Sequence, residues 1–176
     1  WQEIVEVGNS QPPMTLRVNR RRIVLIDYVA RLQDVGLSAK QPGGDALILE
    51  TPVAVESLPG FVDGLVSIQD AGAQRAVQIL DPTAGQRVLD ACAAPGGKTC
   101  HLLEAADIDL LALDSDASRT QLIMQNVRRL GLSATVTVAD CRASDEWWDG
   151  LPFDVILADV PCSASGVVRR HPDVKY

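Results

Sequence analysis

The sequence lacks any long apolar run. Nothing in its 176 residues approaches the roughly 20 consecutive apolar residues that cross a membrane, and no basic start followed by an apolar stretch marks a secretory signal. Low-complexity segments are also missing, and 47% hydrophobic with 22% charged residues is the composition of a globular chain. We therefore expect a cytoplasmic protein without a membrane partner. Because residue 1 is Trp rather than Met, we expect the chain to be a piece of a longer one.

Metal ligands are scarce as well. The chain has four cysteines and two histidines, and no two cysteines form a Cys-x-x-Cys pair. Because the common zinc motifs need such a pair or more histidines, we expect no metal site. Without an export signal, reduced thiols are expected rather than disulfides. Nothing in the sequence indicates an oligomer.

Basic residues are also fewer than acidic ones. The chain has 16 Lys and Arg against 23 Asp and Glu, which gives a net charge of −7. This balance is unfavourable for a nucleic-acid-binding protein, because phosphate contacts normally supply its affinity. Local clusters matter more than the sum. Arginines gather within residues 17–22, 128–129 and 169–170; at 128–129, the end of a predicted helix, solvated surface is the simpler interpretation.

From residue 71 onward the pattern alternates between helices and strands. Helices are predicted at 71–80, 98–105 and 117–130, and strands at 88–89, 110–113, 135–138 and 153–158. Such alternation predicts an α/β fold with a parallel sheet. Each of four strands ends at or just before an acid: Asp90, Asp114, Asp140 and Asp159. Because ligands of open α/β sheets bind at those carboxyl ends, we expect the site there.

The first part of the chain follows another pattern. Alternation at 14–19 and apolar residues at 46–49 predict strands, and helical spacing at 23–35 is followed by a glycine. We therefore expect a small mixed α/β unit at residues 1–58 and the core at residues 59–176.

The loop that follows the first core strand is the most informative segment. Residues 90–99 are Asp-Ala-Cys-Ala-Ala-Pro-Gly-Gly-Lys-Thr. Gly96 and Gly97 let the backbone come close to a ligand. The free N–H groups at the start of the next helix point to the same place. The loop is therefore expected to bind a nucleotide-like ligand.

Three interpretations of this loop compete. Residues 97–99 supply the second half of a P-loop, and Asp159 would then be the acid that binds magnesium. However, Cys92 stands where the first glycine of that motif belongs. The dinucleotide fingerprint fails too, because Cys92 and Ala94 are not glycines. A P-loop-like NTPase stays open as an alternative beside the third interpretation, a methyltransferase loop that holds S-adenosylmethionine.

Residues 90–99 resemble the cofactor loop of the RNA cytosine-5 methyltransferases of the Nop/Sun type. Residues 159–166, Asp-Val-Pro-Cys-Ser-Ala-Ser-Gly, resemble the Pro-Cys motif of that family, and residues 167–173 are similar to its bacterial branch that acts on 16S ribosomal RNA. Further likeness lies at 11–19, 58–61 and 68–71, so the resemblance covers nearly the whole chain.

The resemblance implies a Rossmann-like class I methyltransferase core after a small α/β RNA-binding subdomain. It also implies methyl transfer from S-adenosylmethionine to carbon 5 of a cytosine in 16S ribosomal RNA. Asp114 would bind the ribose hydroxyls beside Arg119, Asp140 would lie by the adenine, and Asp159 by the methionine end. The residues expected at the cofactor are Cys92, Ala93, Ala94, Pro95, Gly96, Gly97, Lys98, Asp114, Arg119, Asp140 and Asp159.

RNA contacts are expected from the two arginine clusters that adjoin the family motifs. One is Arg17 with its neighbours at 20–22, and the other is Arg169, Arg170 and His171. The target base must leave its stack to meet the cofactor, which is easier in single-stranded or loop RNA.

Cys162, in the Pro-Cys motif, is the candidate catalytic residue. A thiolate that adds to carbon 6 of cytosine enables carbon 5 to accept a methyl group, and Cys162 near Asp159 suits that nucleophile. The resemblance instead implies that Cys162 assists proton removal and product release, whereas the attacking cysteine belongs to a later Thr-Cys-Ser motif that this sequence lacks. The sequence also ends soon after the fourth core strand, which predicts a C-terminally incomplete sheet. We therefore expect weak cofactor binding and no turnover by this chain alone; a non-catalytic RNA-binding fragment is the other alternative.

Overall fold

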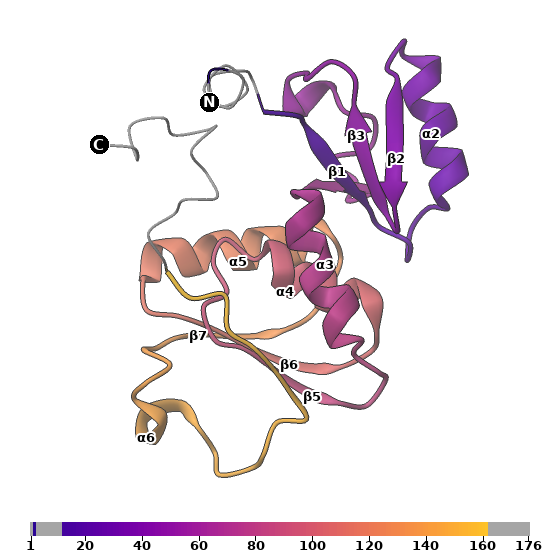
Figure 1. The fold of residues 1–176 in the computed structure, drawn as a ribbon. Coiled ribbons are helices and arrows are strands. Elements are labelled where there is room, and N and C mark those ends of the chain that lie inside the picture. Colours follow the sequence, from indigo (N-terminus) through magenta and orange to yellow (C-terminus); the bar gives the residue numbers. More distant parts are fainter. Residues whose placement is uncertain (1, 3–11, 162–176) are drawn as a thin grey trace.

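The computed structural model describes Gln2 and residues 12–161, which form two packed units (Figure 1). The first unit is an antiparallel sheet with the strand order β2-β3-β1-β4. Its elements are β1 (Thr15–Val18), α2 (Leu25–Asp34), β2 (Ala39–Gly43), β3 (Ala46–Leu49), the 3-10 turn η1 (Val55–Ser57) and β4 (Val66–Ile68). Strand β4 pairs with β1 through Leu16 and Ile68, so the sheet of the first unit includes a strand that lies beyond residue 58.

Alternation along β1 decides which residues reach the core of this unit. Leu16 and Val18 lie in one apolar cluster with Tyr28 and Leu32 of α2. Successive side chains of a strand point to opposite faces. Arg17 therefore leaves β1 on the face opposite α2.

The second unit is a parallel sheet with the strand order β7-β6-β5-β8, as the alternating pattern predicts. Its elements are α3 (Ala71–Leu80), β5 (Arg87–Asp90), α4 (Gly97–Ala105), β6 (Asp109–Asp114), α5 (Ala117–Arg129), β7 (Thr135–Val138), α6 (Ser144–Trp147) and β8 (Val155–Leu157). Among residues 12–161, no helix could serve as a membrane span.

The two faces of this sheet bury different side chains. Val88, Leu110 and Ala112 pack with side chains of α3, α4 and α5 in one cluster. Leu89 and Leu113 pack on the other face, against side chains that include Trp147 of α6. Burial on both faces explains why the inner strands β5 and β6 are apolar between their polar ends.

Strand order places a crevice at one edge of the sheet. The chain runs outward from β5 to β6 and β7, then returns to place β8 on the other side of β5. Open α/β sheets bind ligands at the carboxyl ends of the two strands where the order reverses. Those strands are β5 and β8, which lead into Asp90 and Asp159.

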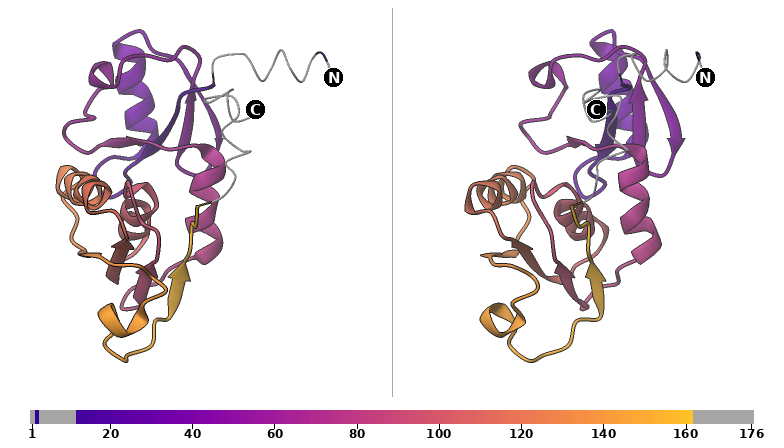
Figure 2. Two further views of the ribbon diagram at one scale, coloured as in Figure 1. Left: turned by 90° about the vertical axis from the view of Figure 1, so that its left-hand side faces the viewer. Right: turned by 60° about the vertical axis from the view of Figure 1, so that its left-hand side comes forward.

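The two units are held together by α3 and by buried polar contacts. Helix α3 packs against both β1 and α4, and Figure 2 shows it extending from the first unit along the side of the second. Arg129, expected on solvated surface, instead donates to the carbonyls of Phe61 and Val66 (2.7 and 3.0 Å) and lies over the Phe61 ring. Its neighbour Arg128 is exposed, as expected.

Candidate functional site

The loop between β5 and α4 is held in a tight conformation by its own backbone and by α5. The N–H of Ala93 donates to the carbonyl of Leu113 (2.8 Å), and that of Gly96 donates to Ala93 (2.7 Å). Gly96 precedes α4 with φ of +96°, and a Cβ there would lie 3.0 Å from the Cα of Ile123. Glycine is therefore required at this position both by the backbone angle and by the close approach of α5.

A cavity of about 190 Å³ opens beside this loop at the crevice between β5 and β8. It is lined by Ile68, Gln69, Ala73, Asp90, Cys92, Ala93, Ala94, Pro95, Gly97, Lys98 and Asp159. Most of the residues expected at the cofactor are thus brought together by the structure. Gly96 is not among the lining residues, because it faces α5.

Asp90 is the buried acid of this cavity. It is 1% exposed, and its Oδ2 accepts from the Thr99 hydroxyl at 2.7 Å, while Oδ1 has no partner in residues 12–161. Burial raises the pKa of Asp90 to about 6, although the Thr99 hydrogen bond acts in the opposite direction. An orphaned buried carboxylate oxygen at a cavity wall is a place where a ligand donor would be stabilising.

The charge lining the cavity is negative. Lys98 forms an ion pair with Asp159 across it, and the same ammonium group is the one cation that also acts on the Asp90 carboxyl group among the described side chains, lowering a pKa that burial raises more strongly. A triphosphate would meet two carboxyl groups here, and the lysine expected to bind its phosphates is already paired. The donor set therefore fits a ligand with positive charge and hydrogen-bond donors better than a magnesium-bound triphosphate.

Asp114, at the end of β6, is tied to the same loop. Its Oδ2 accepts from the Ala94 N–H (3.1 Å) and its Oδ1 from the Asp116 N–H (3.1 Å). Arg119 of α5 donates to the Ala94 carbonyl at 3.0 Å and lies 3.7 Å from Asp114. The structure brings these two predicted residues together at the loop, although neither lines the cavity, and their contact with a ribose stays a prediction.

Asp140 lies outside the lining of the cavity. It pairs with Arg142, whose Nε donates to Oδ1 at 3.0 Å, and this hydrogen bond lowers the pKa of Asp140 to about 2. The segment after β7 still approaches the loop, because Cys141 interacts with Cys92, whose thiol pKa is raised mainly by burial. Contact of Asp140 with an adenine is therefore also left as a prediction.

The prediction that Arg17 contacts RNA is wrong for this structure. Its side chain is 1% exposed and forms a buried ion pair with Glu104 of α4 at 2.8 Å. The alternation of β1 turns Arg17 away from α2, and the sequence pattern gives no sign that α4 covers that face. By contrast, Arg20, Arg21 and Arg22 are exposed.

Four predicted site residues lie outside the described part of the chain: Cys162, Arg169, Arg170 and His171. Their catalytic and RNA-binding roles stay predictions. Sequence reasoning also missed part of the cavity wall, which Ile68, Gln69 and Ala73 supply. The segment 68–71 resembles the family, so the signal was present, but it carried no assigned role.

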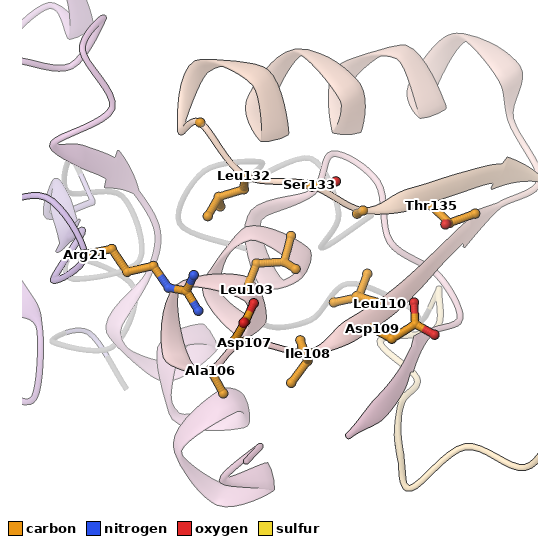
Figure 3. Close-up of a pocket in the computed structure, with 12 residues that line it drawn as sticks. Arg21, Leu103, Ala106, Asp107, Ile108, Asp109, Leu110, Leu132, Ser133 and Thr135 are labelled. Carbon is orange, nitrogen blue, oxygen red and sulfur yellow. The ribbon is translucent and has the colours of Figure 1, made fainter. Parts of the chain in front are cut away.

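A second, larger cavity of about 420 Å³ lies at the opposite end of the sheet (Figure 3). It is lined by the beginnings of β6 and β7, including Asp109 and Thr135, and Arg21 reaches it from the first unit. Because it adjoins the amino ends of the strands and not the glycine loop, it is not the expected cofactor site.

Comparison with known families and proteins agrees with this geometry. Residues 77–176 match the family described as 16S rRNA methyltransferase RsmB/F, and residues 1–56 match the ferredoxin-like domain of RsmF/B-like methyltransferases. A solved structure titled as a methyltransferase homolog protein from Pyrococcus horikoshii superposes with a TM-score of 0.83. It is 34% identical, over 98% of this chain and 58% of that one.

Two curated relatives carry the name ribosomal RNA small subunit methyltransferase B. The protein of Vibrio cholerae is 49% identical over 100% of this chain and 41% of its own length; that of Pseudomonas syringae pv. tomato is 49% identical over 99% and 40%. The chain thus spans about two fifths of the length of these relatives. The matched family model and this identity show that the chain belongs to the 16S rRNA methyltransferase RsmB/F family.

Proposed function

We propose that the cavity beside the glycine loop binds S-adenosylmethionine and that the chain serves methyl transfer to carbon 5 of a cytosine in 16S ribosomal RNA. The bound cofactor would supply an electrophilic methyl group. The observation that supports this proposal most directly is the position of the cavity. It lies where the strand order of the sheet reverses, and residues of the 91–98 loop line it. The names of the relatives support the RNA substrate, and a cytoplasmic location belongs to the same proposal.

Each end of the cofactor has a candidate partner in the described residues. The Asp114 carboxylate, at the end of β6 and behind the loop that walls the cavity, is the group we expect to accept from the ribose hydroxyls. The cavity lining carries two carboxyl groups, Asp90 and Asp159, against one cation, Lys98, and the resulting negative charge would attract a sulfonium and an ammonium group. Cys162, following Asp159 by three positions, would act on the base in proton removal and product release. Arg169, Arg170 and His171 would contact the RNA backbone.

Calorimetry with two ligands tests the cofactor. The chain is titrated with S-adenosylhomocysteine, and separately with ATP and magnesium. We expect weak binding of S-adenosylhomocysteine, none of ATP, and a Kd for S-adenosylhomocysteine about tenfold higher in Asp114→Asn, because a hydrogen bond to a charged group is lost. Asp149→Asn, remote from the cavity, is the matched control. Binding of ATP with magnesium, or equal affinity in the Asp114 variant, would overturn the proposal.

The substrate needs its own assay. Binding of 16S ribosomal RNA is measured by gel shift, and transfer of a labelled methyl group from S-adenosylmethionine is followed with the same RNA. We expect RNA binding without turnover by this chain alone. RNA binding with no affinity for S-adenosylhomocysteine would favour the alternative of a non-catalytic RNA-binding fragment.

A further inference from the structure

The buried Arg17 joins the first unit to the second through a two-pronged ion pair. Its Nε donates to Oε2 of Glu104 at 2.9 Å, and its Nη2 donates to Oε1 at 2.8 Å. The two side chains are 1% and 5% exposed. Arg17 lies on β1 and Glu104 on α4, which belong to the upper and lower units in Figure 1. A parallel pair of hydrogen bonds fixes orientation as well as distance.

The remaining nitrogen of the guanidinium reaches the wall of the cavity. Arg17 Nη1 donates to the side-chain oxygen of Gln69 at 2.6 Å and to the backbone carbonyl of Gly97 at 2.8 Å. Gln69 and Gly97 both line the cavity beside the glycine loop. One buried side chain from the first unit therefore holds two wall residues that come from different segments.

Gly97 is a sensitive point at which to hold this loop. It is the first residue of α4, and it directly precedes Lys98, which pairs with Asp159 across the cavity. Thr99, the next residue, donates to Asp90. A shift of the Gly97 carbonyl would therefore move the donors that face both carboxyl groups of the site.

We propose that Arg17 is a positioning residue for the ligand cavity. Through Gly97 and Gln69 it sets the wall of the cavity and the first turn of α4, so that the first unit helps to shape the site of the second. The identity of the ligand rests on the proposed function, but the effect on the loop does not.

Stability alone explains this arrangement poorly. A buried ion pair gains little net stability, because desolvation of the charges offsets their attraction. The bonds from Nη1 go to neutral oxygens, so they add direction rather than further charge pairing. Lysine could keep the charge beside Glu104, but a single ammonium group cannot reproduce the planar fork that serves Glu104, Gln69 and Gly97 together.

Hydrogen exchange in the ligand-free chain tests the inference directly. Arg17→Lys is compared with the unsubstituted chain and with Arg87→Lys. Arg87 is a matched control, because its guanidinium also donates two hydrogen bonds to one carboxylate, that of Asp149, and one to a backbone carbonyl, that of Leu151. Arg87 does not line the cavity. We expect amide exchange within residues 92–100 to rise about tenfold to a hundredfold in Arg17→Lys, with less than about a twofold change at residues 109–129, because hydrogen bonds to a charged group are lost locally.

Two results would overturn the inference: unchanged exchange at 92–100, or an equal rise at 92–100 and 109–129, which would mean that Arg17 only stabilises the fold. If Arg17→Lys fails to fold, the same exchange measurement is made on Gln69→Met. This variant keeps the ion pair between Arg17 and Glu104 and removes one acceptor of Arg17 Nη1. A rise confined to 92–100 then supports the inference, and no rise contradicts it. Titration of the unsubstituted chain with S-adenosylhomocysteine separates the two proposals, since absent binding counts against the cofactor alone.

Discussion

Replacement of Gly96 by alanine tests whether the glycine loop is shaped by its contact with α5. Gly96 has φ of +96°, and a Cβ at this position would lie 3.0 Å from the Cα of Ile123 and 3.3 Å from its Cγ2. Because the nearest atom is backbone, the helix itself would have to move. Gly85 is the matched control: its φ is +84°, and nothing lies within 4 Å of the corresponding Cβ.

Both substitutions destabilise the folded chain by placing alanine at a positive φ, and only Gly96→Ala also brings a Cβ against α5. Alanine in the left-handed region costs about 1–2 kcal/mol, and the reduced freedom of the unfolded chain returns about 0.4–1 kcal/mol. Gly85→Ala should therefore lower the free energy of unfolding by about 1 kcal/mol. Gly96→Ala adds overpacking against Ile123, typically about 1–3 kcal/mol, so we expect a total loss of about 2–4 kcal/mol.

Urea unfolding of both variants, followed by far-UV circular dichroism, measures this difference. The free energy of unfolding is extrapolated to water, and similar m values indicate that the comparison is between similar folded and unfolded states. If Gly96→Ala costs no more than Gly85→Ala, then the approach of α5 does not constrain the loop. The glycine would in that case be required by its backbone angle alone.

Two further predictions concern the cavity and the junction of the units. Because burial raises the pKa of Asp90 to about 6, the folded chain holds a proton there that the unfolded chain releases, so Asp90 should lower stability by up to about 3 kcal/mol as pH rises from about 4 to 6. Asp90→Asn should remove that decline, so the difference in urea-unfolding free energy between variant and parent should change by up to about 3 kcal/mol across this range; a constant difference would contradict the pKa. Arg129→Lys should cost about 1–3 kcal/mol in the same assay, because one ammonium group cannot replace the bonds to Phe61 and Val66. Arg128→Lys, on exposed surface, should be near neutral, and equal effects of the two substitutions would refute the proposed contacts.

The elements that the sequence predicted well are those whose signals are local. Helix α3 has its predicted bounds, and α5 ends one residue earlier than predicted. In α5 the start is marked by Asp116, whose carboxylate accepts from the Ser118 N–H at 2.8 Å. Strand β6 was recognisable because burial on both faces makes its centre apolar, whereas β7 was recognisable by the alternation of Thr and Val.

The features that the sequence did not reveal depend on partners distant in the chain. Strand β4 has three residues and becomes a strand by pairing with β1, whose residues lie about 50 positions earlier. Its recruitment extends the sheet of the first unit beyond residue 58, the predicted boundary between the units. The exposure of Arg17 was misjudged for a similar reason, since Glu104 is 87 residues away.

The acids of the site show the same division between local and distant information. Their positions at strand ends followed from the alternating pattern, because parallel strands place their carboxyl ends along one edge. What differs among them follows from strand order and from the surrounding side chains: Asp90 on a central strand is buried, whereas Asp140, after an outer strand, pairs with an exposed arginine. Burial raises one pKa to about 6, and an arginine lowers the other to about 2. A row of identical residues in the sequence thus becomes a site with chemically distinct groups, and only Asp90 among these two can change its protonation near neutral pH.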